Sequence, residues 1–169
     1  GVDVTFVRAP MGKLPSAVNG PFDLIHSTYA LSFDERPDEV IKSAAELLRP
    51  GGRLLITTGH PVFAGEWMEL EDEGFGTFLI DYFEPPDDVR SLPDGRIIRS
   101  RAYPISRVFG WLREAGLTVT RLLEPEPERI EELSEDEIRA CIPYDSPSWR
   151  ELYPKLACTP VAVIYEAVK

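Results

Sequence analysis

Apolar and polar residues alternate along this chain with two periods, and the changes of period mark the expected elements. A period of about two, or a short apolar run between turn residues, predicts a β-strand, and a period of about 3.6 predicts a helix. Strands are predicted at 2–9, 22–27, 53–58, 117–125 and 161–168. Helices are predicted over 34–49 and 106–116, with shorter ones after Ser134 and near 148–157.

The first helix and the strand after it are separated by a helix-breaking tripeptide. Apolar residues from Val40 to Leu48 fall on one helical stripe, and Pro37 suits a first helical position. The Pro-Gly-Gly tripeptide at 50–52 is expected to end the helix, because proline cannot continue it and glycine accepts a left-handed turn. The run at 53–58 is apolar enough to predict burial on both faces.

The second helix has start, face and stop signals of its own. Ser106 is the predicted N-cap, Phe109 and Leu112 belong to the apolar face, and Gly116 is the predicted stop. The Ser-x-x-Glu pattern at 134–137 predicts a capping box that opens a short acidic helix.

Residues 62–103 show no sustained period and mix aromatic with acidic side chains. The segment 11–21 also lacks a period and is expected to be a loop. Pro-Asp-Gly-Arg at 93–96 has hairpin chemistry, which predicts paired strands near 77–83 and 96–103. We expect the long irregular segment to form a lid-like insertion.

The alternation of strands and helices is typical of an α/β sheet with helices on both faces. Ligands of such sheets lie outside the carboxyl ends of the strands. In the tetrapeptide Thr-Thr-Gly-His at 57–60, the first two residues end the predicted buried strand and the last two follow it. These residues are therefore candidates for ligand contacts at this edge of the sheet.

Charge and composition exclude several classes of function. The 18 basic and 29 acidic residues give a net charge of −11, which argues against a nucleic-acid partner. The apolar runs are too short to span a bilayer and the first residues lack signal-peptide character, so we expect a cytoplasmic protein without a membrane partner. Cys141 and Cys158 lack metal-ligand spacing, which predicts no metal site and reduced, partly buried thiols, with a disulfide as the minor alternative.

Three segments carry a family resemblance: PFDLIHSTYALSF from Pro21, LLRPGGRLLITTGHP from Leu47 and LREAGLTVTRLLEP from Leu112. Together with the terminal strand they resemble the class I S-adenosylmethionine-dependent methyltransferases, and within them the small-molecule enzymes of the type 11 group. The resemblance implies a Rossmann-like doubly wound sheet with the strand order 3-2-1-4-5-7-6. It also implies S-adenosylmethionine as the cofactor and a small-molecule acceptor.

The resemblance covers nearly the whole chain but begins near the third strand of the family. The family's glycine-rich loop and its ribose-binding acidic residue do not occur in these 169 residues, and Pro10 stands where an acidic residue usually follows the third strand. We therefore expect a single, partial methyltransferase domain over 1–169, incomplete at its N-terminal side. We also expect this chain alone to bind the cofactor poorly.

The resemblance implies site residues on two sides. Met11, His26, Ser27 and Thr28 are the expected cofactor contacts, with a satisfied core histidine as the alternative for His26. They lie in or just after the segments that match the family's third and fourth strands.

The acceptor side is expected to follow the carboxyl ends of the next strands. Tyr29, Phe63, Trp67 and Tyr82 are the expected acceptor contacts, because aromatic side chains suit flat or cationic molecules. Local packing within a lid is the alternative for the last three. His60 is either a general base for a weakly acidic acceptor or a histidine that fixes the backbone before Pro61.

Two functions of different class remain open on this evidence. One is the C-terminal portion of a methyltransferase, and the other is a non-catalytic, truncated module that acts through protein contacts. A nucleotide binder of another doubly wound family is a third, more remote alternative, because no G-x-G-x-x-G is present. Two family strands would separate 2–9 from 22–27, so we expect an open edge. A second copy or the missing N-terminal part fills it, or 2–9 shifts to pair with 22–27.

Overall fold

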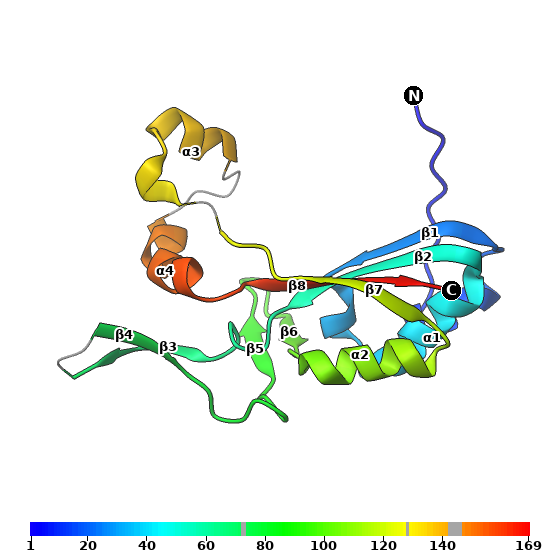
Figure 1. Ribbon diagram of the computed structural model, residues 1–169, viewed down its shortest axis with the longest axis horizontal. Coiled ribbons are helices and arrows are strands. Elements are labelled where there is room, and N and C mark those ends of the chain that lie inside the picture. Colours follow the sequence, from blue (N-terminus) through cyan, green and yellow to red (C-terminus); the bar gives the residue numbers. More distant parts are fainter. Residues whose placement is uncertain (72–73, 128, 142–146) are drawn as a thin grey trace.

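A four-stranded mixed sheet forms the centre of the computed structural model, which describes residues 1–71, 74–127, 129–141 and 147–169 (Figure 1). The strands lie in the order β1 (Phe22–Thr28), β2 (Leu48–Gly59), β8 (Ala162–Val168) and β7 (Thr118–Leu123). β1 and β2 are parallel, and β8 is antiparallel to both β2 and β7. β1, β2 and β7 therefore run in the same direction, and the predicted α/β, Rossmann-like class is confirmed.

Helices α1 (Pro37–Leu47) and α2 (Ile105–Glu114) pack side by side on one face of the sheet (Figure 1). Ile41 of α1 and Leu112 of α2 are fully buried there against Leu54 and Tyr165 of the sheet. β2 alternates between buried and half-buried side chains, so the expected burial of 53–58 on both faces is wrong. Both helices lie on the same side, so the expected cover on both faces is also wrong for the described residues.

The N-terminal residues do not form the predicted strand. Residues 1–10 have no regular structure, and Val2 and Phe6 are 89% and 92% exposed. Alternation fits a strand only when a neighbour accepts its backbone hydrogen bonds, and no described strand lies beside this segment. β1 is an edge strand, as expected, but residues 2–9 have not shifted to pair with it.

The Pro-Gly-Gly tripeptide at 50–52 belongs to β2 and does not end the helix. α1 ends at Leu47, and β2 starts with the next residue. Gly51 has a positive φ of 74°, and its N–H donates to the Lys169 carbonyl at 2.8 Å. Lys169 N–H donates to the Gly52 carbonyl at 3.0 Å, so the bend anchors the C-terminus.

The segment 62–103 forms two hairpins outside the sheet, with strands at the following bounds: β3 (Glu66–Leu70) with β4 (Gly74–Phe78), and β5 (Asp88–Ser91) with β6 (Ile97–Ser100). The turn at 93–96 is confirmed, with Gly95 at φ 82°. The strand predicted before this turn, at 77–83, is wrong, because residues 88–91 pair with β6 and part of 77–83 belongs to β4.

The remaining elements lie near these predictions. α2 begins after Pro104, so the prediction of Ser106 as its N-cap is wrong. Phe109 was predicted on the apolar face but is 43% exposed. Gly116 has a φ of 79° and follows the helix as the predicted stop. Three segments are 3-10 turns, η1 (Met11–Ser16), η2 (Ala30–Phe33) and η3 (Ile130–Glu132), and α3 (Glu135–Cys141) is a short α-helix. η1 corrects the loop expected at 11–21.

Two C-terminal features bear on the later argument. Ser134 and Glu137 form the predicted capping box at the start of α3. α4 (Pro147–Cys158) follows, and Cys158 is a free thiol that is exposed where partial burial was expected. Among the described residues, no helix combines the length and apolarity needed to cross a bilayer.

Candidate functional site

The carboxyl ends of β1, β2 and β7 meet at one edge of the sheet, where ligands of α/β proteins bind. At the end of β1 the chain leaves through Tyr29, which has a positive φ of 56°. This conformation is unusual for a bulky residue and is held by a hydrogen bond from the Tyr29 N–H to the Thr57 carbonyl at 2.8 Å. The strained turn directs η2 toward the β5–β6 hairpin.

The four predicted cofactor residues lie around β1 but not all on one surface. His26 and Thr28 are exposed on the same side of the strand, and the Thr28 hydroxyl lies 2.8 Å from His26 Nε2 in a hydrogen bond. The alternative of a core position for His26 is therefore wrong. Ser27 alternates to the half-buried side, and Met11 packs against the core from η1.

These residues fit S-adenosylmethionine only in part. The end of β1 offers the Ser27 and Thr28 hydroxyls, and β1 has an open edge among the described residues. The sequence contains neither the glycine-rich loop nor the ribose-binding acidic residue that the family uses. The described residues therefore provide one side of such a site.

His60 is buried at the end of β2 and both of its ring nitrogens are engaged. The Val62 N–H donates to Nδ1 at 3.1 Å, which leaves Nε2 as the protonated nitrogen that donates to Glu124 at 2.8 Å. The side chain is 4% exposed. This geometry fixes the backbone before Pro61 and holds Glu124, so it favours the structural alternative for His60.

The predicted acceptor aromatics are dispersed over separate local contacts. Phe63 lies under the Lys155 ammonium at 4.4 Å, and Trp67 stacks on Phe75 with ring centroids 5.8 Å apart. Tyr82 meets the edge of Phe83 at 5.2 Å. Tyr29 is 41% exposed at the end of β1, and burial of part of its ring raises the pKa of its phenol. These contacts agree with local lid packing for Phe63, Trp67 and Tyr82.

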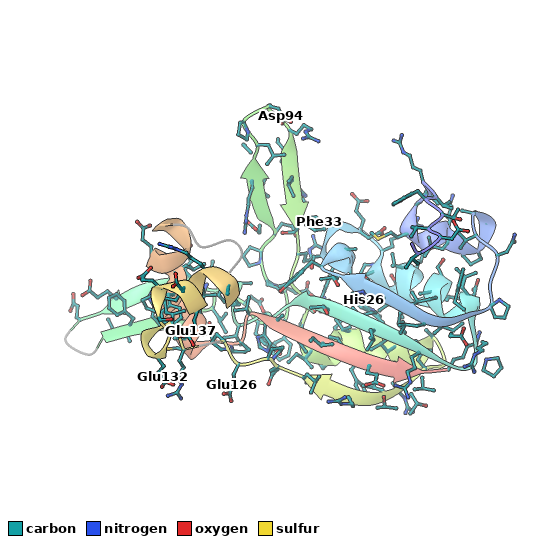
Figure 2. The ribbon with its side chains drawn as sticks, turned by 90° about the horizontal axis from the view of Figure 1, so that it is seen from above. His26, Phe33, Asp94, Glu126, Glu132 and Glu137 are labelled. Carbon is teal, nitrogen blue, oxygen red and sulfur yellow. The ribbon has the colours of Figure 1, made fainter. Side chains whose placement is uncertain are left out.

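A cavity of about 340 Å³ lies where η2 meets the β5–β6 hairpin. It is lined by residues from these two places: Ser32, Phe33, Asp34, Glu35, Asp87, Arg99, Ser100, Arg101 and Tyr103. Figure 2 shows Phe33 near the base of this hairpin, whose tip carries Asp94. None of Phe63, Trp67 and Tyr82 lines this cavity.

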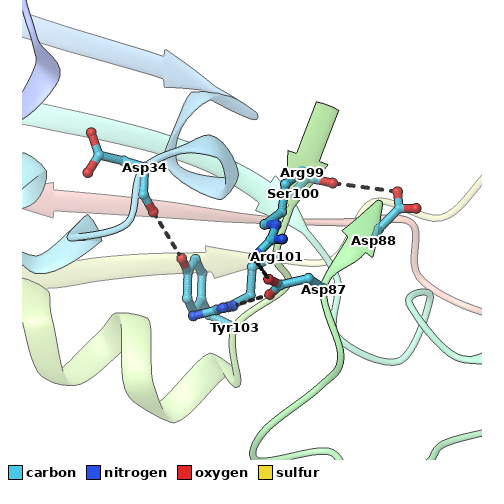
Figure 3. Close-up of polar contacts among 7 residues, drawn as sticks. All are labelled: Asp34, Asp87, Asp88, Arg99, Ser100, Arg101 and Tyr103. Atoms are coloured by element: carbon cyan, nitrogen blue, oxygen red, sulfur yellow. Dashed lines mark hydrogen bonds and ion pairs between the residues drawn. The ribbon is translucent and has the colours of Figure 1, made fainter. Parts of the chain in front are cut away.

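Two hydrogen bonds join the walls of the cavity. The Arg101 N–H donates to the Ser32 carbonyl at 3.0 Å, and the Tyr103 hydroxyl donates to the Asp34 carbonyl at 3.3 Å (Figure 3). Tyr103 is only 4% exposed and packs edge-on against Trp111 of α2. The cavity is thereby fixed to the helical layer.

Asp87 lies between two arginines, with Arg101 Nε at 2.6 Å and Arg99 at 3.3 Å (Figure 3). The hydrogen bond from Arg101 lowers the pKa of the Asp87 carboxyl, and burial raises the pKa of the Tyr103 phenol. At neutral pH the first group stays ionised and the second stays protonated. The cavity is therefore suited to orienting a ligand by charge, and these two groups are poor proton acceptors.

A second, larger cavity of about 770 Å³ lies after β7, between the segment with Glu124 and Glu126 and the end of α4. Figure 2 shows Glu126 on that segment, which lies three strands away from β1 in the sheet. Three interstrand spacings separate the two ends by about 14 Å. A group bound at the end of β1 is therefore far from the second cavity and close to the first.

Sequence reasoning missed the charged residues of the first cavity. Asp34 and Tyr103 are 69 residues apart, and Asp87 reaches Arg101 across 14 residues. The hairpin turn at 93–96 was the one local signal for this site. Correct placement of β5 opposite β6 would have brought Asp87 and Arg99 together.

Comparison with known proteins supports the fold. The family model of a methyltransferase domain matches residues 1–56. A S-adenosylmethionine-dependent methyltransferase from Mesorhizobium loti has a similar structure, with a TM-score of 0.67 and 22% identity; the match covers 100% of this chain and 72% of that one. A proposed methyltransferase of the same kind from Listeria monocytogenes has a TM-score of 0.62 and 19% identity, over 90% of this chain and 63% of that one. No curated protein matches in sequence.

The chain thus has the fold of the class I S-adenosylmethionine-dependent methyltransferases, as its sequence predicted. The strand order β1-β2-β8-β7 corresponds to the 4-5-7-6 part of the family order. The chain spans 63% to 72% of the length of the two similar structures.

Proposed function

We propose that this chain is the acceptor-binding portion of a S-adenosylmethionine-dependent methyltransferase that acts on a small molecule. The observation that supports this best is the position of the 340 Å³ cavity, which follows the carboxyl end of β1 by one short 3-10 turn. That volume lies at the lower end of ordinary ligand pockets, which run from about 300 to 1,000 Å³.

The cofactor, when bound, supplies a methyl group on a sulfonium, which is already activated for transfer. The chain's own contribution is to hold the cofactor and the acceptor in a suitable relative orientation. The Ser27 and Thr28 hydroxyls would hold the cofactor at the end of β1, and Tyr29 turns the chain into the cavity wall. Orientation of this kind supplies a large part of the rate enhancement in a two-substrate reaction.

No general base is part of this proposal. His60 donates through Nε2 and accepts through Nδ1, so it has no free lone pair to receive a proton. The Asp87 carboxyl is stabilised in its ionised form by Arg101. An acceptor that is itself a good nucleophile fits this site best.

The proposal places the protein in the cytoplasm, where the exposed free thiol of Cys158 would stay reduced. It also assigns an occupant to the open edge of β1. A strand from a segment that carries the glycine-rich loop, in the same protein or in a second copy, would pair there and complete the cofactor site.

Methyl transfer from labelled S-adenosylmethionine tests the proposal directly. The 169-residue chain and a version extended at its amino end by a strand and a glycine-rich loop are each incubated with a mixture of small-molecule acceptors. We expect weak cofactor binding to the first, and saturable binding with methylated products from the second. Tight calorimetric binding to the first would show that the loop is dispensable.

The second candidate function is a non-catalytic module that acts through protein contacts, favoured by the edge of β1 that is open among the described residues. It predicts that the extended version neither binds the cofactor nor methylates anything, while the chain still associates with another protein through β1. Labelled product from the extended version would exclude this alternative.

A further inference from the structure

The β3–β4 hairpin extends away from the central sheet, and among the described residues its two strands pair only with each other (Figure 1). A two-stranded hairpin is at best marginally stable in water when nothing packs against it. Large apolar residues of this hairpin and of the segment after it are exposed: Met68 (45%), Leu70 (51%), Phe75 (59%), Phe78 (54%) and Ile80 (70%). The hairpin therefore presents an uncovered apolar surface.

The two strands of the hairpin differ in charge. β3, with the sequence Glu-Trp-Met-Glu-Leu, carries the carboxylates of Glu66 and Glu69. Charged side chains on an edge strand oppose pairing with another chain. β4, with the sequence Gly-Phe-Gly-Thr-Phe, carries no charged side chain. Of the two edges, that of β4 is therefore the one open to pairing with another strand.

Two glycines leave one face of β4 without side chains over part of its length. Gly74 lies opposite Leu70 in the hairpin register. Gly76 lies opposite Met68, and a Cβ on Gly76 would be 3.3 Å from Leu70 Cδ1. Glycine within a strand is typical of a place where another backbone or side chain approaches closely. This face of β4 therefore has room for a large side chain from a neighbouring strand.

We propose that two copies of this chain associate by antiparallel pairing of their β4 strands, about a two-fold axis at Gly76. The joint sheet has the order β3-β4-β4-β3, which places the uncharged strands at its centre and the glutamates of β3 on its outer strands. In this register Phe78 of each copy lies opposite Gly74 of the other, where its ring fills the space left by the glycine. Both copies use the same surface, so the association closes at a dimer.

The size of the apolar surface favours a second copy as its partner. With about 200 Å² for each large side chain, the exposed parts of the five apolar residues amount to roughly 550 Å² in each copy. A standard interface buries about 800 Å² per partner, and about 65% of an interface between identical subunits is apolar, which requires about 520 Å². One hairpin therefore offers the apolar area that one subunit of such a dimer contributes. The pairing leaves the edge of β1 free for the strand that the proposed function places there.

Sedimentation equilibrium of the 169-residue chain measures the association. We expect the mass to rise from 19.0 kDa toward twice that value between about 1 μM and about 500 μM protein. Phe78→Ser should raise the dissociation constant about tenfold or more, because Phe78 is the side chain that fills the partner's glycine face. Ile97→Ser is the matched control, since Ile97 is 68% exposed on the other hairpin, and it should leave the dissociation constant unchanged. Circular dichroism of each variant checks that the fold is retained.

A disulfide tests the register directly and does not depend on the stability of Phe78→Ser. In the proposed pair the two copies of Gly76 lie opposite each other, with Cα atoms about 4.5–5.5 Å apart, a separation that a disulfide can bridge. Gly76→Cys should therefore give a covalent dimer on mild oxidation. Ser91→Cys, on the exposed strand β5, should give no more than the background that the exposed thiol of Cys158 produces in the unsubstituted chain.

A chain that keeps a mass of 19.0 kDa up to about 500 μM would overturn the inference. A dimer that is weakened as much by Ile97→Ser as by Phe78→Ser would do the same, because it would lie elsewhere on the surface. Cross-linking of Gly76→Cys that is no faster than that of Ser91→Cys would also overturn it. None of these results depends on methyl transfer, so the proposed function stands or fails separately.

Discussion

Replacing Tyr165 with phenylalanine should stabilise the protein, although Tyr165 is among its most deeply buried residues. The side chain lies on β8, is 0% exposed and packs in the core beneath α2. Its hydroxyl has no hydrogen-bond partner among the described residues. Tyr165→Phe removes only this oxygen, and the ring keeps its packing.

The size of the effect follows from the cost of a buried, unpaired hydroxyl. Leaving a buried polar group unsatisfied costs roughly 1–3 kcal/mol, so its removal should raise the free energy of unfolding by about 1 kcal/mol. Unfolding entropy is about 2.1 cal/mol/K per residue, or about 0.35 kcal/mol/K for 169 residues. The melting temperature should therefore rise by about 3 °C.

The same substitution should change the response to alkaline pH. Burial raises the pKa of the Tyr165 phenol well above its ordinary value of 10.0. The folded state therefore keeps a proton that the unfolded state loses above about pH 10, and stability falls as the pH rises through that range. Tyr165→Phe removes this contribution, so its stability should fall less steeply between pH 9 and about pH 11.

Urea unfolding and thermal melts at pH 7 and about pH 11 measure both effects. Tyr103→Phe is the matched control, because the Tyr103 hydroxyl donates to the Asp34 carbonyl at 3.3 Å. That variant should lose about 1 kcal/mol at pH 7. A loss of more than about 1 kcal/mol in Tyr165→Phe would refute the reasoning, because it would mean that the Tyr165 hydroxyl is hydrogen-bonded in solution.

Two more substitutions test contacts away from the sheet. Lys155 is 6% exposed and donates to the carbonyls of Phe63, at 2.6 Å, and of Gly65. Lys155→Met should lower the free energy of unfolding in urea by roughly 2–4 kcal/mol and speed proteolysis after Phe63. An unchanged free energy of unfolding would contradict the contact. Hydrogen bonds from the hydroxyl and the backbone N–H of Ser134 lower the pKa of Glu137. In Ser134→Ala, which keeps the N–H donor, an NMR titration should find that the pKa rises part of the way toward its ordinary value, and an unchanged pKa would contradict the capping box.

The sequence predicted the parts of the fold that depend on local pattern. The strands at 53–58, 117–125 and 161–168 and the helix over 106–116 appear close to their expected places. Each of them has an apolar face set by residues within one segment, and strong turn or stop residues bound it. The segment 2–9 has an equally clear alternation but no neighbouring strand, so its pattern alone could not make it a strand.

The candidate site was predictable only in outline. Parallel strands and the Thr-Thr-Gly-His segment at 57–60 indicated the edge of the sheet near which the cavity lies, and the insertion at 62–103 supplies one wall of that cavity. The individual side chains depend on which segments of that insertion pair. Because 88–91 pairs with β6 where 77–83 was expected, Asp87 and not Tyr82 faces the arginines.

The two sides of the site differ in how fully this chain builds them. On the side of the proposed acceptor, the hydrogen bond from Arg101 to Ser32 joins the two walls of the 340 Å³ cavity. The contacts from His60 to Glu124 and from Lys155 to Phe63 fix loops outside this cavity. The cavity walls are therefore joined before any ligand arrives. On the cofactor side, β1 presents an open edge with exposed apolar residues, and nothing in the described chain organises it. Acceptor binding should therefore be measurable in this chain without S-adenosylmethionine, whereas cofactor binding should depend on the strand that pairs with β1.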